Sequence, residues 1–386
     1  MGYFDEVKRE IDRGREGEYA GIPVPQLPRM NKYLGGIQAG RYDLLGADSG
    51  VGKTSFADFF YVISPIESII EGLTDFDYMI DYWSLEISKK RKLVKLSALY
   101  MYLKFGIITD YNELLSRGGL ENRLSDNMYA AFLKTEEFIE RLQDYVRIHE
   151  GKAYPTQMAI WTSKYRKSIG KIKYRDVSNP DEPLLEENPH GKDDPRRYRY
   201  ERIYAPSSNK FIHLVLVDHI GKIRREHESS EKGSRLLNKK DNIDKHSDFC
   251  VEGRDFYGTS YVNVSQFNRG KSDIQRQKYK ELRPEREDFK DSGNTFEDAD
   301  LVYAGFDPEV YNIKSYMGYD VAKLHGRGRF LFILKNRDGA GNVELALRFI
   351  GECGHFCEIF TREQIKADSS LYKEILNTNI QIIKPI

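Results

Sequence analysis

The chain of 386 residues is long enough for one large α/β domain or two ordinary ones. It carries 60 Lys and Arg against 60 Asp and Glu, so net charge favours no partner, and any nucleic-acid site must come from local patches. Three cysteines exclude a disulfide framework and fit a reducing cytoplasm. The sequence has no apolar run of about twenty residues and no signal-peptide core, so we expect no membrane partner.

The N-terminal segment predicts a short arm. Phe4, Val7 and Ile11 recur at helical spacing, so residues 4–13 are expected to form an amphipathic helix, with a glycine-rich linker after it. Such a helix is either a frayed terminus or an arm that docks on a neighbouring subunit. We therefore divide the chain into an arm at 1–20, a main domain at 21–360 with a surface insertion at 171–210, and a tail at 361–386.

A phosphate-binding loop follows the first predicted strand. Residues 46–54 are Gly-Ala-Asp-Ser-Gly-Val-Gly-Lys-Thr, with Ala47 where the strict pattern has glycine. Lys53 is expected to reach the β and γ phosphates of a nucleotide, and Thr54 to offer a hydroxyl to Mg²⁺. A strand at 42–45 and a helical pattern at 55–63 supply the required context. The predicted nucleotide contacts are Ala47, Asp48, Ser49, Gly50, Val51, Gly52, Lys53, Thr54 and Ser55.

Further apolar runs predict an α/β sheet that is covered on both faces. The predicted strands are 42–45, 78–84, 212–217, 261–264, 301–305, 330–334 and 343–349. Residues 86–148 have a helical pattern, and a short helix is expected near 370–376. Four prolines and dense charge at 179–195 place a surface loop in the insertion, with a hairpin around 199–203.

Polar residues follow three of these strands. Asp218 ends the most apolar strand, where a carboxylate would hold the water shell of the metal (Walker B) or simply cap the strand. Glu86 fits two roles, polarising the attacking water or starting the next helix. Gln266 would sense the γ-phosphate through its amide, or be satisfied by the backbone.

Two further polar groups lie near the C-terminus. Lys335 and Arg337 are two positions apart and so project from one face of a strand, where they would clamp a phosphate or remain solvated. Taken alone, this pair favours the solvated interpretation. Cys353, His355 and Cys357 are close in sequence, but a structural zinc site needs four ligands, so we expect no zinc.

The order of these motifs resembles the motor domain of the DnaB-like replicative helicases, from about residue 21 to 356. The matching segments are Gly46-Ala-Asp-Ser-Gly-Val-Gly-Lys-Thr54, Trp83-Ser-Leu-Glu86, Val215-Leu-Val-Asp218, Ser265-Gln-Phe-Asn-Arg-Gly270, Asp288-Phe-Lys-Asp-Ser-Gly293, Glu297-Asp-Ala-Asp300 and Lys335-Asn-Arg-Asp-Gly339. The resemblance implies a RecA-like P-loop NTPase, with a mainly parallel central sheet flanked by helices and antiparallel strands toward the C-terminus. The cofactors it implies are ATP and Mg²⁺.

The resemblance also assigns roles to the candidate residues. Lys53 and Thr54 would bind phosphate and metal, Glu86 would be the catalytic carboxylate, and Asp218 would be the Walker B acid. Gln266 would couple the nucleotide state to DNA. Lys335 and Arg337 would reach the nucleotide of the adjacent subunit, the latter as an arginine finger. A finger in trans requires an oligomer, expected as a hexameric ring in which the arm packs on the next subunit.

Two basic stretches match the DNA-facing loops of this family. The expected contacts to single-stranded DNA are Arg224, Arg225, Lys232, Arg235, Arg269, Lys271, Arg276 and Lys278. Acidic residues are mixed among them, which is also typical of a solvated surface. Their placement after two strands of the motor domain favours DNA.

The sequence departs from the family at three places. About twenty residues precede the motor domain where the family has a primase-contacting domain, His219 replaces an aromatic residue, and the insertion at 171–210 has no counterpart. We expect a phage-type, 5′→3′ DNA helicase of the host cytoplasm, with a primase, polymerase or loader as partner. The alternatives are a RecA-like DNA-dependent ATPase without unwinding activity, such as a recombinase or loader, and a nucleotide-gated scaffold.

Overall fold

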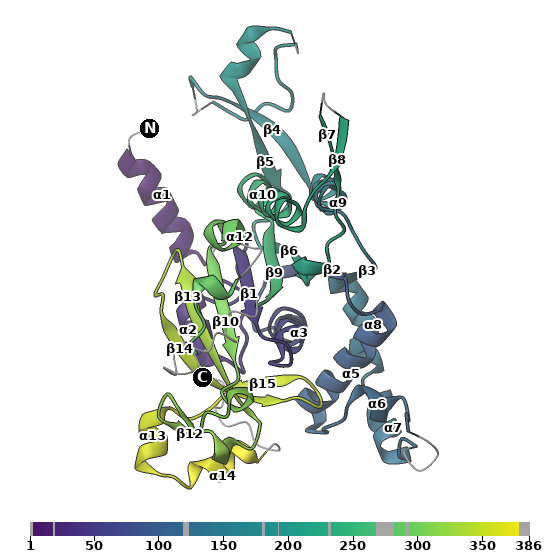
Figure 1. The fold of residues 1–386 in the computed structure, drawn as a ribbon. Helices are drawn as coiled ribbons and strands as arrows, with labels where there is room; N and C mark the ends of the chain where they lie inside the picture. The colour runs from purple at the N-terminus through teal and green to yellow at the C-terminus, as the bar shows by residue number, and fades with distance from the viewer. Residues whose placement is uncertain are drawn as a thin grey trace.

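The computed structural model describes residues 3–17, 20–118, 123–179, 182–191, 193–230, 233–267, 282–289 and 293–377. Within these ranges, nine strands form one sheet in the order β15-β14-β13-β10-β1-β9-β6-β2-β3 (Figure 1). The strands from β10 to β3 in this order are parallel, whereas β13, β14 and β15 are antiparallel. The predicted fold, a mainly parallel sheet with antiparallel strands toward the C-terminus, is confirmed.

Each strand predicted from an apolar run is present. The strands of the sheet are β1 (Tyr42–Ala47), β2 (Asp77–Ser84), β3 (Val146–Glu150), β6 (Phe211–Asp218), β9 (Ser260–Gln266), β10 (Leu301–Phe306), β13 (Gly328–Asn336), β14 (Val343–Ile350) and β15 (His355–Glu358). Successive residues of a strand face opposite sides of the sheet. In β6, Leu214 and Leu216 therefore pack into one hydrophobic core, and Val215 and Val217 pack into the other.

Helices cover both faces of the sheet (Figure 1). The α-helices of the described residues are α1 (Tyr3–Arg15), α2 (Pro28–Leu34), α3 (Lys53–Ala57), α4 (Ser64–Ile70), α5 (Lys89–Phe105), α6 (Tyr111–Leu114), α7 (Asp126–Leu133), α8 (Glu136–Tyr145), α9 (Pro155–Ser168), α10 (Lys239–Tyr257), α12 (Gly293–Asp298), α13 (Arg362–Ala367) and α14 (Leu371–Leu376). A π-helical segment, η1 (Asp58–Ile63), joins α3 to α4. The core with Leu214 contains residues of η1, α5 and α8, and the core with Val215 contains residues of α9 and α10.

One prediction of helix was wrong at its end. The sequence predicts helix as far as Ile148, but β3 begins at Val146, which pairs in parallel with Ile80 of β2. The apolar residues Val146 and Ile148 alternate with Arg147 and His149, which is the period of a strand. Pairing with β2 extends the sheet by one strand, so tertiary contact decides this boundary.

The insertion contains an ordered hairpin. Strand β4 (Gly170–Asp176) pairs with β5 (Tyr200–Pro206), so the hairpin predicted around 199–203 is longer than expected. It projects beyond α9 and α10 at one end of the molecule (Figure 1). The C-terminal tail forms α14 as predicted, and α13 in addition. Ile365, Tyr372 and Ile375 of these two helices are buried in the core.

Among the described residues, none of the helices has the length and apolar character needed to cross a membrane.

Candidate nucleotide site

The parallel strands bring the predicted site residues that follow β1, β2, β6 and β9 to one edge of the sheet. Ala47, at the end of β1, pairs with Gln266 at the end of β9. Ser84, at the end of β2, pairs with Asp218 at the end of β6. Ligands of open α/β sheets bind at the carboxyl ends of the strands. The loop after β1, the carboxylate after β6 and the segment after β2 therefore face the same space.

The phosphate-binding loop has the backbone that its sequence requires. Gly50 and Gly52 adopt φ values of +83° and +107°, which side chains other than hydrogen rarely allow. A Cβ atom at Gly46 would lie 2.3 Å from the ring of Phe289, so the strand also needs glycine where it enters the loop. Helix α3 starts directly after Gly52 and continues through η1 and α4, so the first N–H groups of a long helical segment face the loop.

Lys53 lies over this loop. Its ammonium group donates to the carbonyl oxygen of Asp48 at 3.0 Å. Burial lowers the pKa of Lys53, while the charges of Asp218, Asp48 and Glu86 act in the opposite direction. A half-buried cation surrounded by backbone N–H groups suits a polyphosphate.

Thr54 and Asp218 meet at the metal side of the loop. The hydroxyl of Thr54 donates to Oδ1 of Asp218 at 3.2 Å. Mg²⁺ prefers oxygen ligands and is commonly held by one or two protein groups together with phosphate and water. The hydroxyl and the carboxylate therefore fit a Mg²⁺–nucleotide complex, with Thr54 as a ligand and Asp218 as a ligand or a holder of its water.

Glu86 follows β2 on the same edge and remains exposed. Its Oε1 lies 3.2 Å from Nζ of Lys222 and 3.5 Å from Nε2 of His219. Nδ1 of His219 accepts the backbone N–H of Gly221 at 3.1 Å, so the proton of the neutral ring is on Nε2, facing Glu86. Burial lowers the pKa of His219 and favours this neutral form. Nε2 of His219 therefore lies on the side of the ring that faces the carboxylate of Glu86.

A second cation, Arg329, lies beside the loop, and no motif in the sequence marks it. Nε of Arg329, at the start of β13, donates to the carbonyl oxygen of Val51 at 3.1 Å. The same guanidinium pairs with Asp307 at 3.0 Å and lies over the ring of Phe349. Burial lowers the pKa of Arg329. Only the pairing of β13 with β10 brings this residue to the loop, so a local motif could not identify it.

Lys335 and Arg337 do not lie at this site in the same chain. Because β13 is antiparallel to β10, Phe330 pairs with Phe306 while Asn336 pairs with Leu301, at the opposite edge of the sheet. The length of β10 separates the two edges by about 17 Å. There Arg337 pairs with Asp300 at 2.8 Å, and Lys335 donates to the carbonyl oxygen of Phe296 at 3.2 Å.

Three of the eight predicted DNA contacts, Arg224, Arg225 and Arg235, lie within the described residues. Arg224 and Arg225 are exposed after Lys222, and the Arg224 guanidinium lies 4.8 Å from the ring centre of Tyr154. Arg235 belongs to the hairpin of β7 (His227–Ser230) and β8 (Gly233–Leu236) and pairs with Asp241 at 3.0 Å. The remaining predicted contacts, Lys232, Arg269, Lys271, Arg276 and Lys278, lie outside the described residues.

The cysteine-rich segment near the C-terminus is part of the core. His355 lies between the rings of Phe59 and Tyr102, and Sγ of Cys353 donates to the carbonyl oxygen of Ile350. Cys357 is buried. Across the described ranges, no three His, Cys, Asp or Glu side chains are grouped in a way that could hold a metal ion.

Two solved structures have the same fold. The ATPase domain of G40P is 14% identical, with a TM-score of 0.62, and the match covers 93% of this chain and 100% of that one. A DnaB-like replicative helicase, solved to show its interactions with primase, is also 14% identical, with a TM-score of 0.62, over 93% of this chain and 68% of that one. No protein-family model and no curated protein matches the sequence. The chain therefore has the RecA-like fold of the ATPase domain of DnaB-like replicative helicases.

Proposed function

We propose that the protein is an ATP-dependent DNA helicase that moves on single-stranded DNA as a ring. The observation that carries this proposal is the contact between Thr54 and Asp218, beside Lys53 and Glu86. These residues supply a metal ligand, a carboxylate for the metal, a cation for the phosphates and a carboxylate for the attacking water. When bound between Thr54 and Asp218, Mg²⁺ would neutralise charge on the phosphates of the nucleotide, and Glu86 would orient the attacking water.

The position of Arg337 supports an assembly. It lies at the opposite edge of the sheet from its own phosphate-binding loop, so it serves a nucleotide only if the nucleotide belongs to another copy. Its partner Asp300 keeps the guanidinium at the surface, with 48% of the side chain exposed. An arginine finger at a subunit interface would stabilise the charge of the transferring phosphoryl group. Lys335, two residues earlier on β13, supplies a second cation to the same interface.

The arm supplies a second contact between subunits. Tyr3, Phe4, Val7 and Ile11 of α1 are 89%, 78%, 56% and 57% exposed. The last three fall on one helical face, which a second copy would cover. This supports the division into an arm, an ATPase domain and a tail.

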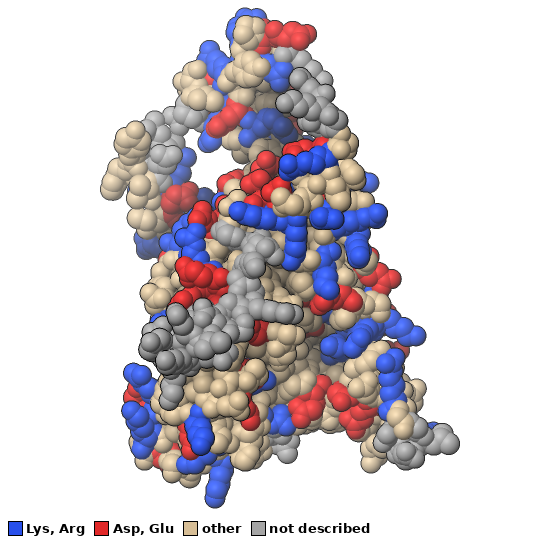
Figure 2. Space-filling model, in the orientation of Figure 1, with Lys and Arg blue, Asp and Glu red and all other residues tan. Residues whose placement is uncertain are grey.

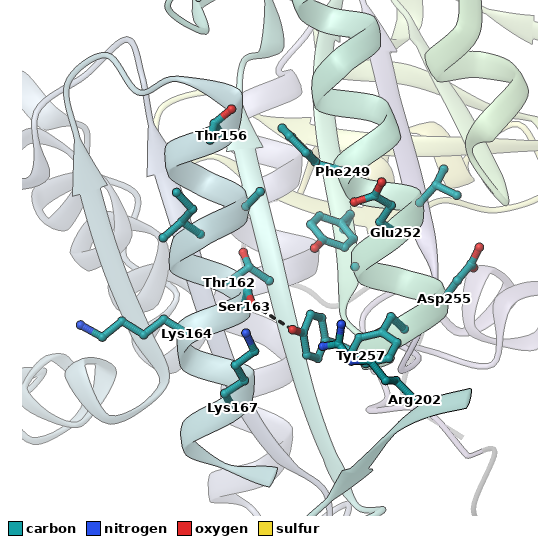
Figure 3. A pocket seen from close by; sticks show the side chains of 16 residues that line it. Thr156, Thr162, Ser163, Lys164, Lys167, Arg202, Phe249, Glu252, Asp255 and Tyr257 are labelled. Atoms are coloured by element: carbon teal, nitrogen blue, oxygen red, sulfur yellow. Dashed lines mark hydrogen bonds between the residues drawn. The ribbon is translucent and has the colours of Figure 1, made fainter. Parts of the chain in front are cut away.

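The receiving surface in this proposal is the groove between α9 and α10 (Figure 3). The groove has a volume of about 1010 Å³ and includes the apolar side chains of Ile160, Phe249 and Phe256. Among its lining residues, Ser163 of α9 and Tyr257 of α10 join the two helices through a hydrogen bond of 2.8 Å (Figure 3). With 13 residues, α1 is about 20 Å long, and α9 with 14 is about 21 Å, so the arm matches the groove in length.

Single-stranded DNA would contact the basic residues after β6. Arg224, Arg225 and Arg235 are exposed there. Figure 2 shows Lys and Arg interspersed with Asp and Glu over one face of the described residues, so local loops rather than a broad field would provide this contact. The solved DnaB-like helicase interacts with primase, and a primase is a candidate partner for this chain as well.

The test is ATP hydrolysis with and without single-stranded DNA, on size-fractionated protein with Mg²⁺. We expect DNA to stimulate hydrolysis in the hexamer-sized fraction. Hydrolysis that DNA leaves unchanged would contradict the motor role, and activity confined to filaments would favour a recombinase. A forked duplex added to the active fraction then separates unwinding from translocation alone.

A further inference from the structure

Lys92 is a buried cation close to the metal side of the nucleotide site. It belongs to α5 and is 0% exposed. Its ammonium group donates to both carboxylate oxygens of Asp58, at 2.9 and 3.0 Å, and to the hydroxyl oxygen of Tyr82 at 2.6 Å. A buried ammonium is costly unless it is paired and its protons are bonded, and three short contacts meet that requirement here.

Tyr82 connects this pair to Asp218. Its hydroxyl lies 2.8 Å from Oδ1 of Asp58 and 3.4 Å from Oδ2 of Asp218. Because Lys92 donates to the hydroxyl oxygen, the hydroxyl proton is directed toward one of the two carboxylates. Nζ of Lys92 itself lies 3.8 Å from Oδ2 of Asp218. The three side chains therefore form one buried network that ends on the Walker B candidate.

The two oxygens of Asp218 thus have different partners. Oδ1 accepts from Thr54 on the metal side, at 3.2 Å, and Oδ2 faces Tyr82 and Lys92 on the buried side. Without the ammonium, two buried carboxylates would lie close together and repel each other. With it, Oδ2 of Asp218 has a cation beside it, and Oδ1 is the oxygen that accepts from Thr54.

We propose that Tyr82 and Lys92 are positioning residues for the metal site: the Tyr82 hydroxyl and the Lys92 ammonium together hold Oδ2 of Asp218, so that Oδ1 faces Thr54 and the Mg²⁺ position. Both side chains are fully buried behind Asp218, so they would act on the nucleotide site through Asp218. Partners of this kind orient metal-binding groups, and their loss typically weakens metal affinity by about 10- to 100-fold. The inference rests on the proposed nucleotide site, but only on its binding of Mg²⁺ and not on DNA translocation.

The test compares Tyr82→Phe with Tyr78→Phe. Tyr78 lies on the same strand, is equally buried, and donates its hydroxyl to the carbonyl oxygen of Tyr61 at 2.9 Å, away from Asp218. We expect Tyr82→Phe to raise the Mg²⁺ concentration for half-maximal ATP hydrolysis about tenfold and to leave metal-free nucleotide binding unchanged. Tyr78→Phe should leave both unchanged. Equal Mg²⁺ dependence of the two variants would overturn the role of Tyr82.

A binding measurement separates this inference from the proposed activity. Mn²⁺ binding to the ADP complex, followed by electron paramagnetic resonance, reports the metal site even in a protein that does not hydrolyse ATP. We expect Tyr82→Phe to weaken Mn²⁺ binding about tenfold relative to Tyr78→Phe. Normal Mn²⁺ binding in Tyr82→Phe would overturn the inference, whatever the ATPase result.

The role of Lys92 is tested by replacing it together with Asp58. Lys92→Met alone would leave Asp58 buried without its cation and would endanger folding. Lys92→Met combined with Asp58→Asn removes both charges together. We expect this double variant to fold and to show a weakening of Mn²⁺ binding similar to that of Tyr82→Phe, about tenfold, because Oδ2 of Asp218 has lost the ammonium that lies 3.8 Å away. A folded double variant with normal Mn²⁺ binding would overturn the role of Lys92.

Discussion

The hydroxyl of Thr54 donates to Oδ1 of Asp218 at 3.2 Å, although 164 residues separate the two in the chain. One follows β1 and the other ends β6, and β9 lies between these strands in the sheet. The parallel register brings both to the same edge. The metal side of the site is therefore set by the order of the strands, and neither residue alone defines it.

Glu86→Gln should preserve ATP binding and abolish hydrolysis. The amide keeps the shape of the side chain but cannot accept the proton of the attacking water, so we expect hydrolysis to fall by about 10²- to 10⁴-fold. Nucleotide affinity from equilibrium binding and turnover from phosphate release are the measurements. The control is Glu71→Gln, an exposed carboxylate that pairs with Lys104 on α5. Unchanged hydrolysis in Glu86→Gln would remove this residue from the mechanism.

Arg337→Ala should abolish hydrolysis in a homogeneous assembly, by about 10³-fold, if the guanidinium acts in trans. Mixing with Lys53→Ala subunits should restore activity, because these subunits supply Arg337 to the intact sites of their neighbours. Phosphate release as a function of the mixing ratio is the measurement. Each variant alone serves as the inactive control. A mixture as inactive as its components would contradict a finger in trans.

The sequence predicts the strands and the fold better than it predicts at which of the two edges of the sheet, the carboxyl or the amino ends of the parallel strands, a residue lies. Apolar runs such as 212–217 mark buried strands regardless of their neighbours, and the loop at 46–54 fixes the start of α3. The opposite placement of Arg329 and Arg337 depends on β13 being antiparallel to β10, which no local pattern encodes. Lys92 belongs to a helix with a basic first turn, where a sequence pattern predicts a solvated side chain, and only tertiary packing buries it beside Asp58.

Phe4→Ser combined with Ile11→Ser should disrupt the assembly without unfolding the subunit. These side chains are 78% and 57% exposed, so the isolated subunit gains little from them, whereas docking on a second copy would bury both. Sedimentation velocity should show a shift from the oligomer to the monomer, with unchanged thermal unfolding of the monomer. Leu133→Ser is the control, since Leu133 is 49% exposed at the end of α7, an element to which the proposal gives no part in the interface. An oligomer that survives the double substitution would exclude the arm from the interface.

His355→Phe should make stability less sensitive to acid. Burial, with a smaller effect of Arg348, lowers the pKa of His355 to about 3, against about 6.5 in an unfolded chain. Its Nδ1 has no hydrogen-bond partner among the described residues, and its ring packs against the rings of Phe59 and Tyr102, so phenylalanine fits the same place.

Because the pKa of His355 is lowered in the folded state, acid should destabilise the wild-type protein. A depressed pKa in the folded state means that the unfolded chain takes up a proton first, so stability present above pH 6.5 is lost as the pH falls toward 3. Between pH 7.5 and pH 5 this group alone should cost the wild type about 2 kcal/mol of unfolding free energy, a loss that His355→Phe avoids. Urea denaturation at the two pH values measures the difference. Equal losses in both proteins would mean that His355 takes up its proton at the same pH in the folded and unfolded states, which would contradict a lowered pKa in the folded protein.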